Sequence, residues 1–166
     1  MKEEQFKVLK ALSEATSRMD INMFAKKVNL DPNQTIQKVQ ELAKEGFLQK
    51  VGNGFGITTK GKAALKAFVT VPEGMGFHFY YGINQPTDLT AKTLGEFYEN
   101  TKQISADSLE FHLYRGDFEN WLKDACKEPE FAQEIGVVKD ADLKGEELRA
   151  ELLKVLDAKY GIQELL

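Results

Sequence analysis

The chain has 166 residues, of which 42% are hydrophobic and 29% are charged, and these values suit one or two small globular domains. It has no apolar run long enough to cross a bilayer, and its charged start is unlike a secretory signal, so we expect a cytoplasmic protein. Cys126 is the only cysteine, which excludes an internal disulfide and a cysteine metal cluster.

The net charge of −4 is distributed unevenly along the chain. Residues 1–70 hold 12 Lys and Arg against 7 Asp and Glu, a net charge of +5, whereas residues 71–166 hold 10 against 19, a net charge of −9. A basic half joined to an acidic half is the pattern expected when only one half binds a polyanion. Ordinary solvated surface charge is the alternative explanation.

Three helices are predicted in the first 45 residues. Apolar residues recur every three or four positions over 3–16, which indicates a helix with one buried face. Asp20 is expected to cap a second helix that reaches Val28. Asp31 and Pro32 are expected to start a third helix, which ends near Gly46. The residues predicted to be buried by this third helix are Ile36, Val39, Leu42 and Ala43.

Residues 46–65, GFLQKVGNGFGITTKGKAAL, predict a β-hairpin followed by a fourth helix. Strands over 47–51 and 55–58 flank Gly52-Asn53-Gly54, which tolerates the positive φ of a tight turn, and Thr58 or Thr59 caps the helix. The stretches NMFAKKVNLDPNQTIQKVQELAKEGFLQKV and ITTKGKAAL resemble prokaryotic and archaeal winged helix-turn-helix regulators. This resemblance covers about residues 1–70 and implies a DNA-binding transcriptional regulator.

The resemblance implies that the third helix enters the major groove of double-stranded DNA while the hairpin touches the backbone. Asn and Gln can pair with adenine, Lys can reach guanine or phosphate, and Thr35 can donate to a phosphate. The third helix has no arginine and the hairpin tip is uncharged, so docking on ribosomal RNA and ribosomal proteins stays open as an alternative. The predicted nucleic-acid-binding residues are Asn33, Gln34, Thr35, Gln37, Lys38, Lys26, Lys27, Lys44, Lys50, Lys60 and Lys62.

No constellation in the sequence predicts catalysis. Residues 56–62 fit the phosphate-loop spacing GxxxxGK, but Ala63 stands where Ser or Thr should bind magnesium. His78 and His112 are the only histidines, and neither has a metal-ligand spacing, so both are expected to be hydrogen-bonded core or boundary residues. We therefore expect a protein that is not an enzyme and that has no metal or cofactor.

Residues 71–76 are expected to be a short linker, and residues 77–166 an acidic, mostly helical domain with one aromatic strand at 77–81. The predicted fold class is mainly α with small β. SADSLEFHLYRGDFENWLKDACKEPEFAQEI resembles an uncharacterised, mainly archaeal domain with the pattern SxxFHxxRGDFxxWI. Gly116 is expected to permit a turn between two helices, and Asp117 to cap the second. Helices are predicted over about 90–103, 105–113, 117–125, 129–135 and 142–159.

The apolar face of the last long helix is compatible with two kinds of packing. Its apolar residues can dock on its own domain, or they can form a homodimer that presents two basic heads to a symmetric target. The residues predicted for the dimer contact are Leu148, Leu152, Val155 and Leu156.

Overall fold

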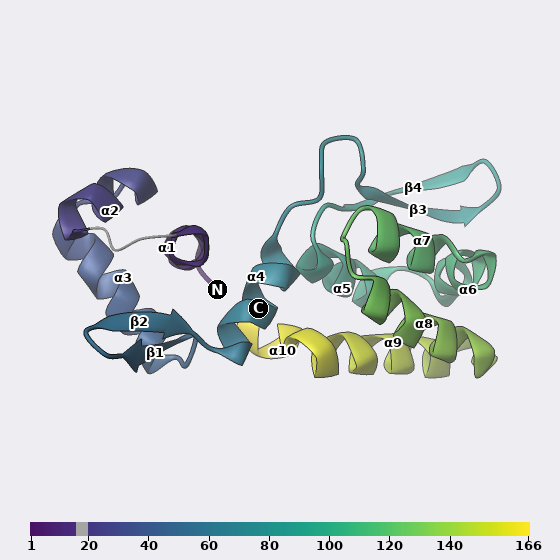
Figure 1. Ribbon diagram of the computed structural model, residues 1–166. Helices are drawn as coiled ribbons and strands as arrows, with labels where there is room; N and C mark the ends of the chain where they lie inside the picture. Colours follow the sequence, from purple (N-terminus) through teal and green to yellow (C-terminus); the bar gives the residue numbers. More distant parts are fainter. Residues whose placement is uncertain (16–19) are drawn as a thin grey trace. The chain divides into compact units, whose positions relative to one another are not determined.

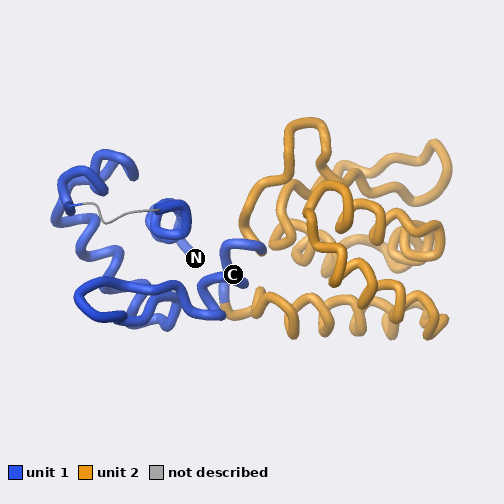
Figure 2. The backbone as a smooth tube through the Cα atoms, viewed as in Figure 1, with its two compact units in different colours: residues 1–66, 165–166 blue, residues 67–164 orange. Residues whose placement is uncertain are grey.

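The computed structural model describes residues 1–15 and 20–166 and divides the chain into two compact units (Figure 2). Unit 1 comprises Met1–Lys66 with Leu165–Leu166, and unit 2 comprises Ala67–Glu164. The described residues are mainly helical and contain two small antiparallel sheets, which confirms the predicted fold class. Among them, no helix is both long and apolar enough to cross a membrane.

Unit 1 consists of three helices, a β-hairpin and the first part of a fourth helix (Figure 1). This is the element order predicted for residues 1–70. The predicted end of the first helix, at residue 16, lies outside the described residues. The elements are α1 (Glu3–Glu14), α2 (Ile21–Val28), α3 (Pro32–Lys44), β1 (Leu48–Val51), β2 (Gly54–Ile57) and α4 (Thr59–Phe68).

The two ends of α3 follow from its local sequence. Asp31 Oδ1 accepts the backbone N–H of Gln34 at 2.9 Å, and Gln34 Oε1 accepts the N–H of Asp31 at 3.3 Å, so the two residues form a capping box. Pro32 occupies the first helical position, where its missing N–H costs nothing. Gly46 adopts a φ of +84° and leads the chain out of the helix. The predicted start and end of this helix are therefore confirmed.

The buried face of α3 differs from the prediction, because only Leu42 of the four expected residues is buried, and Val39 and Ala43 are half-buried. Ile36, which was expected in the core, is 42% exposed, whereas Thr35 and Leu42 are fully buried. Thr35 and Leu42 are seven residues apart and share one helix face, and Ile36 lies about 100° from Thr35. Ile36 instead lines an apolar hollow with Phe24 and Phe55.

Unit 2 contains a second β-hairpin and a group of helices (Figure 1). The hairpin lies on one side of the two helices that span residues 94–103 and 106–115, and the longest helix, residues 145–160, lies on their other side. The elements that follow α4 are β3 (Phe77–Gly82), β4 (Gln85–Ala91), α5 (Leu94–Gln103), α6 (Ala106–Arg115), α7 (Asp117–Asp124), α8 (Pro129–Asp140), α9 (Gly145–Tyr160) and α10 (Ile162–Leu165).

Aromatic rings fill the space between the β3–β4 hairpin and the helices α5, α6 and α7. Phe77 lies at the centre of this cluster, with ring centroids 5.7 Å from Phe97, 5.2 Å from Phe118 and 5.6 Å from Trp121. Trp121 Nε1 also donates to the backbone oxygen of Met75 at 2.8 Å. The contacts of Phe77 with Phe97 and Trp121 are edge-to-face, and such contacts add to the free energy gained from burial alone.

Strand β4 is absent from the prediction, which placed a loop after residue 81 and a helix from residue 90. Residues 85–91 instead pair antiparallel with β3, with Phe77 opposite Ala91 and Tyr80 opposite Pro86. Helix α5 begins later than predicted, and Thr93 Oγ1 caps it by accepting the N–H of Glu96 at 3.0 Å.

The apolar side of α9 lies inside unit 2. Leu148, Leu152 and Leu156 are fully buried, and α9 packs against α5, α6 and α8. These three leucines are therefore not available to a second copy of the chain, which corrects their assignment to a dimer contact. Val155 is half-buried and lines a shallow hollow with residues of α8.

Gly61, in the first turn of α4, packs against the backbone of its own unit. A Cβ atom at this position would lie 2.3 Å from the Phe47 carbonyl oxygen and 2.7 Å from Ile57 Cγ2. Thr58 Oγ1 holds the turn in place by accepting the Gly61 N–H at 3.0 Å. The glycine is thus required by packing.

We expect Gly61→Ala to destabilise unit 1 by roughly 2–3 kcal/mol, because the overlap outweighs the better helix propensity of alanine. Amide hydrogen exchange over α3, β1 and β2 measures the effect. Gly54→Ala is the matched control, since the nearest atom to its Cβ, the Val51 oxygen, is 3.9 Å away. Equal protection in the two variants would contradict the packing role.

Candidate functional site

The outward face of α3 carries a row of polar side chains. Asn33, Gln37, Gln40 and Lys44 recur at helical spacing on the side opposite the buried Leu42, and all four are exposed. Gln37 Nε2 donates to a glutamate on the same helix at 3.1 Å, and within the described residues the other three form no side-chain hydrogen bond. This row is called the α3 polar face below.

Five of the predicted nucleic-acid-binding residues make polar contacts within unit 1, namely Gln34, Thr35, Gln37, Lys38 and Lys60. Thr35 is fully buried, and its hydroxyl donates to the Asp31 backbone oxygen at 2.8 Å, so it cannot reach a phosphate. Lys38 Nζ lies 3.2 Å from a Glu41 carboxylate oxygen and has a side chain only 13% exposed. Lys60 Nζ donates to a backbone oxygen at the end of α3 at 3.0 Å. Thr35 is therefore a wrong prediction, and Lys38 and Lys60 offer less free charge than expected.

The other predicted residues are exposed. Gln34 is exposed too, but its side chain belongs to the capping box, so a substitution there would also weaken the start of α3. Lysines lie on α2, on β1 and in the first half of α4, and they supply positive charge without a fixed geometry. These lysines are Lys26, Lys27, Lys50 and Lys62.

A second group of polar residues joins the β3–β4 hairpin to α6 in unit 2. The backbone N–H of Tyr80 donates to His112 Nε2 at 2.8 Å, and the backbone oxygen of Tyr80 accepts the Ser108 hydroxyl at 2.6 Å. Ser108 and His112 are four residues apart and therefore share one face of α6. Both polar backbone groups of Tyr80 are thus paired with side chains of a helix.

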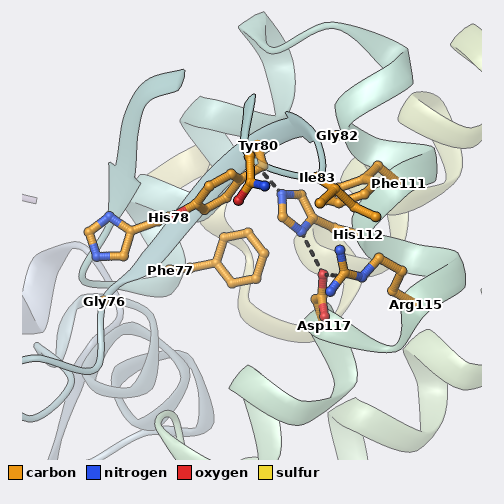
Figure 3. A pocket seen from close by; sticks show the side chains of 11 residues that line it. Gly76, Phe77, His78, Tyr80, Gly82, Ile83, Phe111, His112, Arg115 and Asp117 are labelled. Carbon is orange, nitrogen blue, oxygen red and sulfur yellow. Dashed lines mark hydrogen bonds and ion pairs between the residues drawn. The ribbon is translucent and has the colours of Figure 1, made fainter. Parts of the chain in front are cut away.

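His112 makes a second bond, to the residue that begins α7. Its Nδ1 lies 2.9 Å from Asp117 Oδ2 (Figure 3), and the side chain is 4% exposed. Because Nε2 accepts the Tyr80 N–H, the ring proton is on Nδ1 and is donated to the Asp117 carboxylate. Asp117 therefore does not cap α7 as predicted. It is the first residue of that helix and fixes the tautomer of His112.

The backbone conformation between α6 and α7 brings Asp117 within hydrogen-bond distance of His112. Gly116 ends α6 with a φ of +81°, a left-handed conformation that favours glycine, and α7 starts at the next residue. Burial lowers the pKa of His112 below its ordinary value of 6.5, although the hydrogen bond to Asp117 opposes this shift. The folded state thus favours a neutral imidazole.

This arrangement leaves His112 without a free nitrogen for acid–base chemistry or for a metal. The described residues contain no cluster of three or more His, Cys, Asp or Glu side chains that could hold a metal ion. Sequence reasoning missed Tyr80 and Ser108 because the contact joins the backbone of Tyr80 to side chains 28 and 32 residues further along the chain. The only available signal was the spacing of a serine and a histidine by four residues on one predicted helix.

Unit 1 thus consists mainly of three helices with a hairpin, and unit 2 contains a hairpin that docks on helices through His112. Residues 72–165, more than half of the chain, match the DUF5752 family, a family of unknown function. The chain belongs to this family, and the Tyr80, Ser108, His112 and Asp117 contacts all lie within the matched residues. A search of curated proteins and a search of solved structures found no match.

We expect His112→Phe to destabilise unit 2 by roughly 1–3 kcal/mol, because an aromatic ring is kept while the Tyr80 N–H loses its acceptor and Asp117 loses its donor. Urea denaturation followed by the fluorescence of Trp121, which contacts the same ring cluster, reports the change. His78→Phe is the matched control, since His78 is exposed on the same hairpin. Equal midpoints for the two variants would show that the His112 bonds contribute little.

Stability should also depend on pH through His112. Below about pH 6.5 the unfolded imidazole binds a proton that the folded one excludes, so this contribution is complete above pH 6.5 and declines as the pH falls toward the lower folded pKa. The stability difference between the parent protein and His112→Phe should therefore shrink from pH 7.5 to pH 5.5. A difference that stays constant would mean that His112 does not titrate differently in the two states.

Proposed function

We propose that unit 1 binds double-stranded DNA through α3 and the β1–β2 hairpin, and that the protein is a transcriptional regulator. The α3 polar face is the observation that carries this proposal. An α-helix fits the major groove, where Asn and Gln can hydrogen-bond adenine in pairs. Asn33 and Gln40 are exposed and form no hydrogen bond to another described side chain, so binding would not have to break one.

The exposed lysines support the same proposal. Lys26, Lys27, Lys44, Lys50 and Lys62 can neutralise phosphates, and this contribution does not depend on base sequence. Unit 1 has the positive net charge that such contacts need, and unit 2 has a negative one. We further propose a cytoplasmic location, because a prokaryotic or archaeal genome lies there.

One observation favours the alternative of ribosomal RNA and ribosomal proteins. Lys38 is paired with Glu41 and lies 3.7 Å from Glu4, which leaves α3 with little net positive charge. The hairpin tip at Gly52 and Asn53 is also uncharged. Binding by shape and backbone contact, as is common for RNA, does not need base-reading arginines.

The test begins with selection from a pool of random DNA duplexes, followed by affinity measurements on the enriched site. Asn33→Ala and Gln37→Ala should each lower the preference for that site over unrelated DNA by about 1–3 kcal/mol. Lys50→Ala should weaken binding to all duplexes alike and reduce the salt dependence by about one counterion. Gln133→Ala, an exposed glutamine on α8, is the matched control and should change neither quantity.

Two outcomes would contradict DNA reading by α3. One is that no duplex is enriched, and the other is that Asn33→Ala and Gln37→Ala leave the preference unchanged. Crosslinking in cells then separates the alternatives, since recovery of one region of ribosomal RNA would assign unit 1 to the ribosome. Palindromic DNA sites would instead indicate that the protein binds as a homodimer.

A further inference from the structure

A hollow of about 390 Å³ lies in unit 2 between the β3–β4 hairpin and the helices α6 and α7 (Figure 3). Part of its wall is apolar and comes from Phe77, Ile83 and Phe111. The volume is within the range of sites that bind small molecules, and such sites combine apolar walls with a few polar groups. The polar side chains in this hollow include Arg115, Asp117 and His78.

Arg115 is held in the hollow by two contacts that leave most of its donors unused. Its guanidinium carbon lies 4.6 Å from the centre of the Phe111 ring, and its Nε lies 3.6 Å from Asp117 Oδ2. Within the described residues, its two terminal nitrogens, Nη1 and Nη2, have no hydrogen-bond partner. The Phe111 ring thus lies against the guanidinium, and Asp117 lies beside its Nε.

Arg149 shows how a guanidinium is used when its role is structural. Its Nη1 donates to the backbone oxygens of Thr101 and Ile104, both at 2.6 Å, at the end of α5. Its Nε and Nη2 donate to the Glu146 carboxylate at 2.8 Å and 3.2 Å. All three nitrogens of Arg149 are therefore engaged, in contrast to the open edge of Arg115.

The open edge has a definite chemical preference. A planar guanidinium presents two parallel N–H donors that match the two oxygens of a carboxylate or phosphate. The negative charge of Asp117 is already shared between the His112 N–H and Arg115 Nε, which limits its repulsion of a bound anion. At another part of the hollow, His78 uses Nδ1 on the Thr90 hydroxyl at 3.1 Å and leaves Nε2 for a ligand.

We propose that this hollow binds a small organic ligand that carries a carboxylate or phosphate group on an apolar body. Arg115 binds the oxyanion with Nη1 and Nη2, and Phe77, Ile83 and Phe111 contact the apolar body. Asp117 and the Phe111 ring orient Arg115. The site is independent of nucleic-acid binding by unit 1, and failure of either proposal leaves the other intact.

The test uses the full chain labelled with ¹⁵N and two probes, phenyl phosphate and benzoate, with benzamide as an uncharged probe of similar shape. We expect saturable shifts of the Ile83, Phe111 and Arg115 amide signals with at least one anionic probe and weaker binding of benzamide. Arg115→Gln should weaken binding of the anionic probe about tenfold or more, since both parallel donors are lost. Arg115→Lys keeps the positive charge but loses the two parallel N–H donors of the guanidinium, and should give an intermediate affinity.

Lys123→Gln is the matched control for charge, because it removes one positive charge from an exposed position of α7 and should leave the affinity unchanged. Thermal unfolding checks the fold of Arg115→Gln, and we expect little change because Arg115 is 52% exposed. Tighter binding of phenyl phosphate assigns a phosphate ligand, and tighter binding of benzoate assigns a carboxylate. The proposal is overturned if neither anion gives saturable shifts, if benzamide binds as tightly, or if folded Arg115→Gln keeps the parent affinity.

Discussion

The doubly hydrogen-bonded imidazole of His112 is the constraint on which the arrangement of unit 2 depends. A two-stranded hairpin is marginally stable alone, and β3–β4 is such a hairpin. At Tyr80, α6 supplies the donor and the acceptor that a third strand would have supplied. The same imidazole reaches α7 through Asp117, so one buried ring joins a strand and two helices. Loss of the Asp117 carboxylate would leave Nδ1 of the buried His112 unpaired, which is costly in a low dielectric.

That constraint also positions Arg115. The left-handed Gly116 brings α7 back beside α6, and Asp117 then lies between His112 and Arg115. The same carboxylate oxygen, Asp117 Oδ2, lies 2.9 Å from His112 Nδ1 and 3.6 Å from Arg115 Nε. The run of His112, Arg115, Gly116 and Asp117 is therefore explained by one local geometry, in which only the outer edge of Arg115 is left for a ligand.

The features that could be predicted best from the sequence are those set by residues adjacent in the chain. Asp31 and Gly46 mark the ends of α3 through their own backbone preferences, and so they could be recognised without tertiary information. Strand β4 could not, because QPTDLTA contains a proline and lacks alternation, and it becomes a strand through pairing with β3 and through the Asn100 amide donating to Thr90. The leucines of α9 were recognised as an apolar face, but periodicity cannot show whether such a face meets the same unit or another chain. The Tyr80–His112 contact spans 32 residues, and the four-residue spacing of Ser108 and His112 on one helix does not by itself identify the strand that they contact.

The two units use their cations differently, and this difference bears on both proposals. The cations of unit 1 that the structure describes are lysines, and an ammonium group acts as a point charge that tolerates many geometries. Such groups suit contact with a repeating phosphate backbone, where register matters little and base recognition must come from amides such as Asn33 and Gln37. Unit 2 contains, besides eight lysines, Arg115 and Arg149, whose planar guanidinium groups match a partner of fixed geometry. For Arg149, the partners are the backbone oxygens at the end of α5 and the Glu146 carboxylate. For Arg115, Nη1 and Nη2 have no such partner among the described residues. The guanidinium chemistry therefore favours a discrete ligand at Arg115 rather than a polymer.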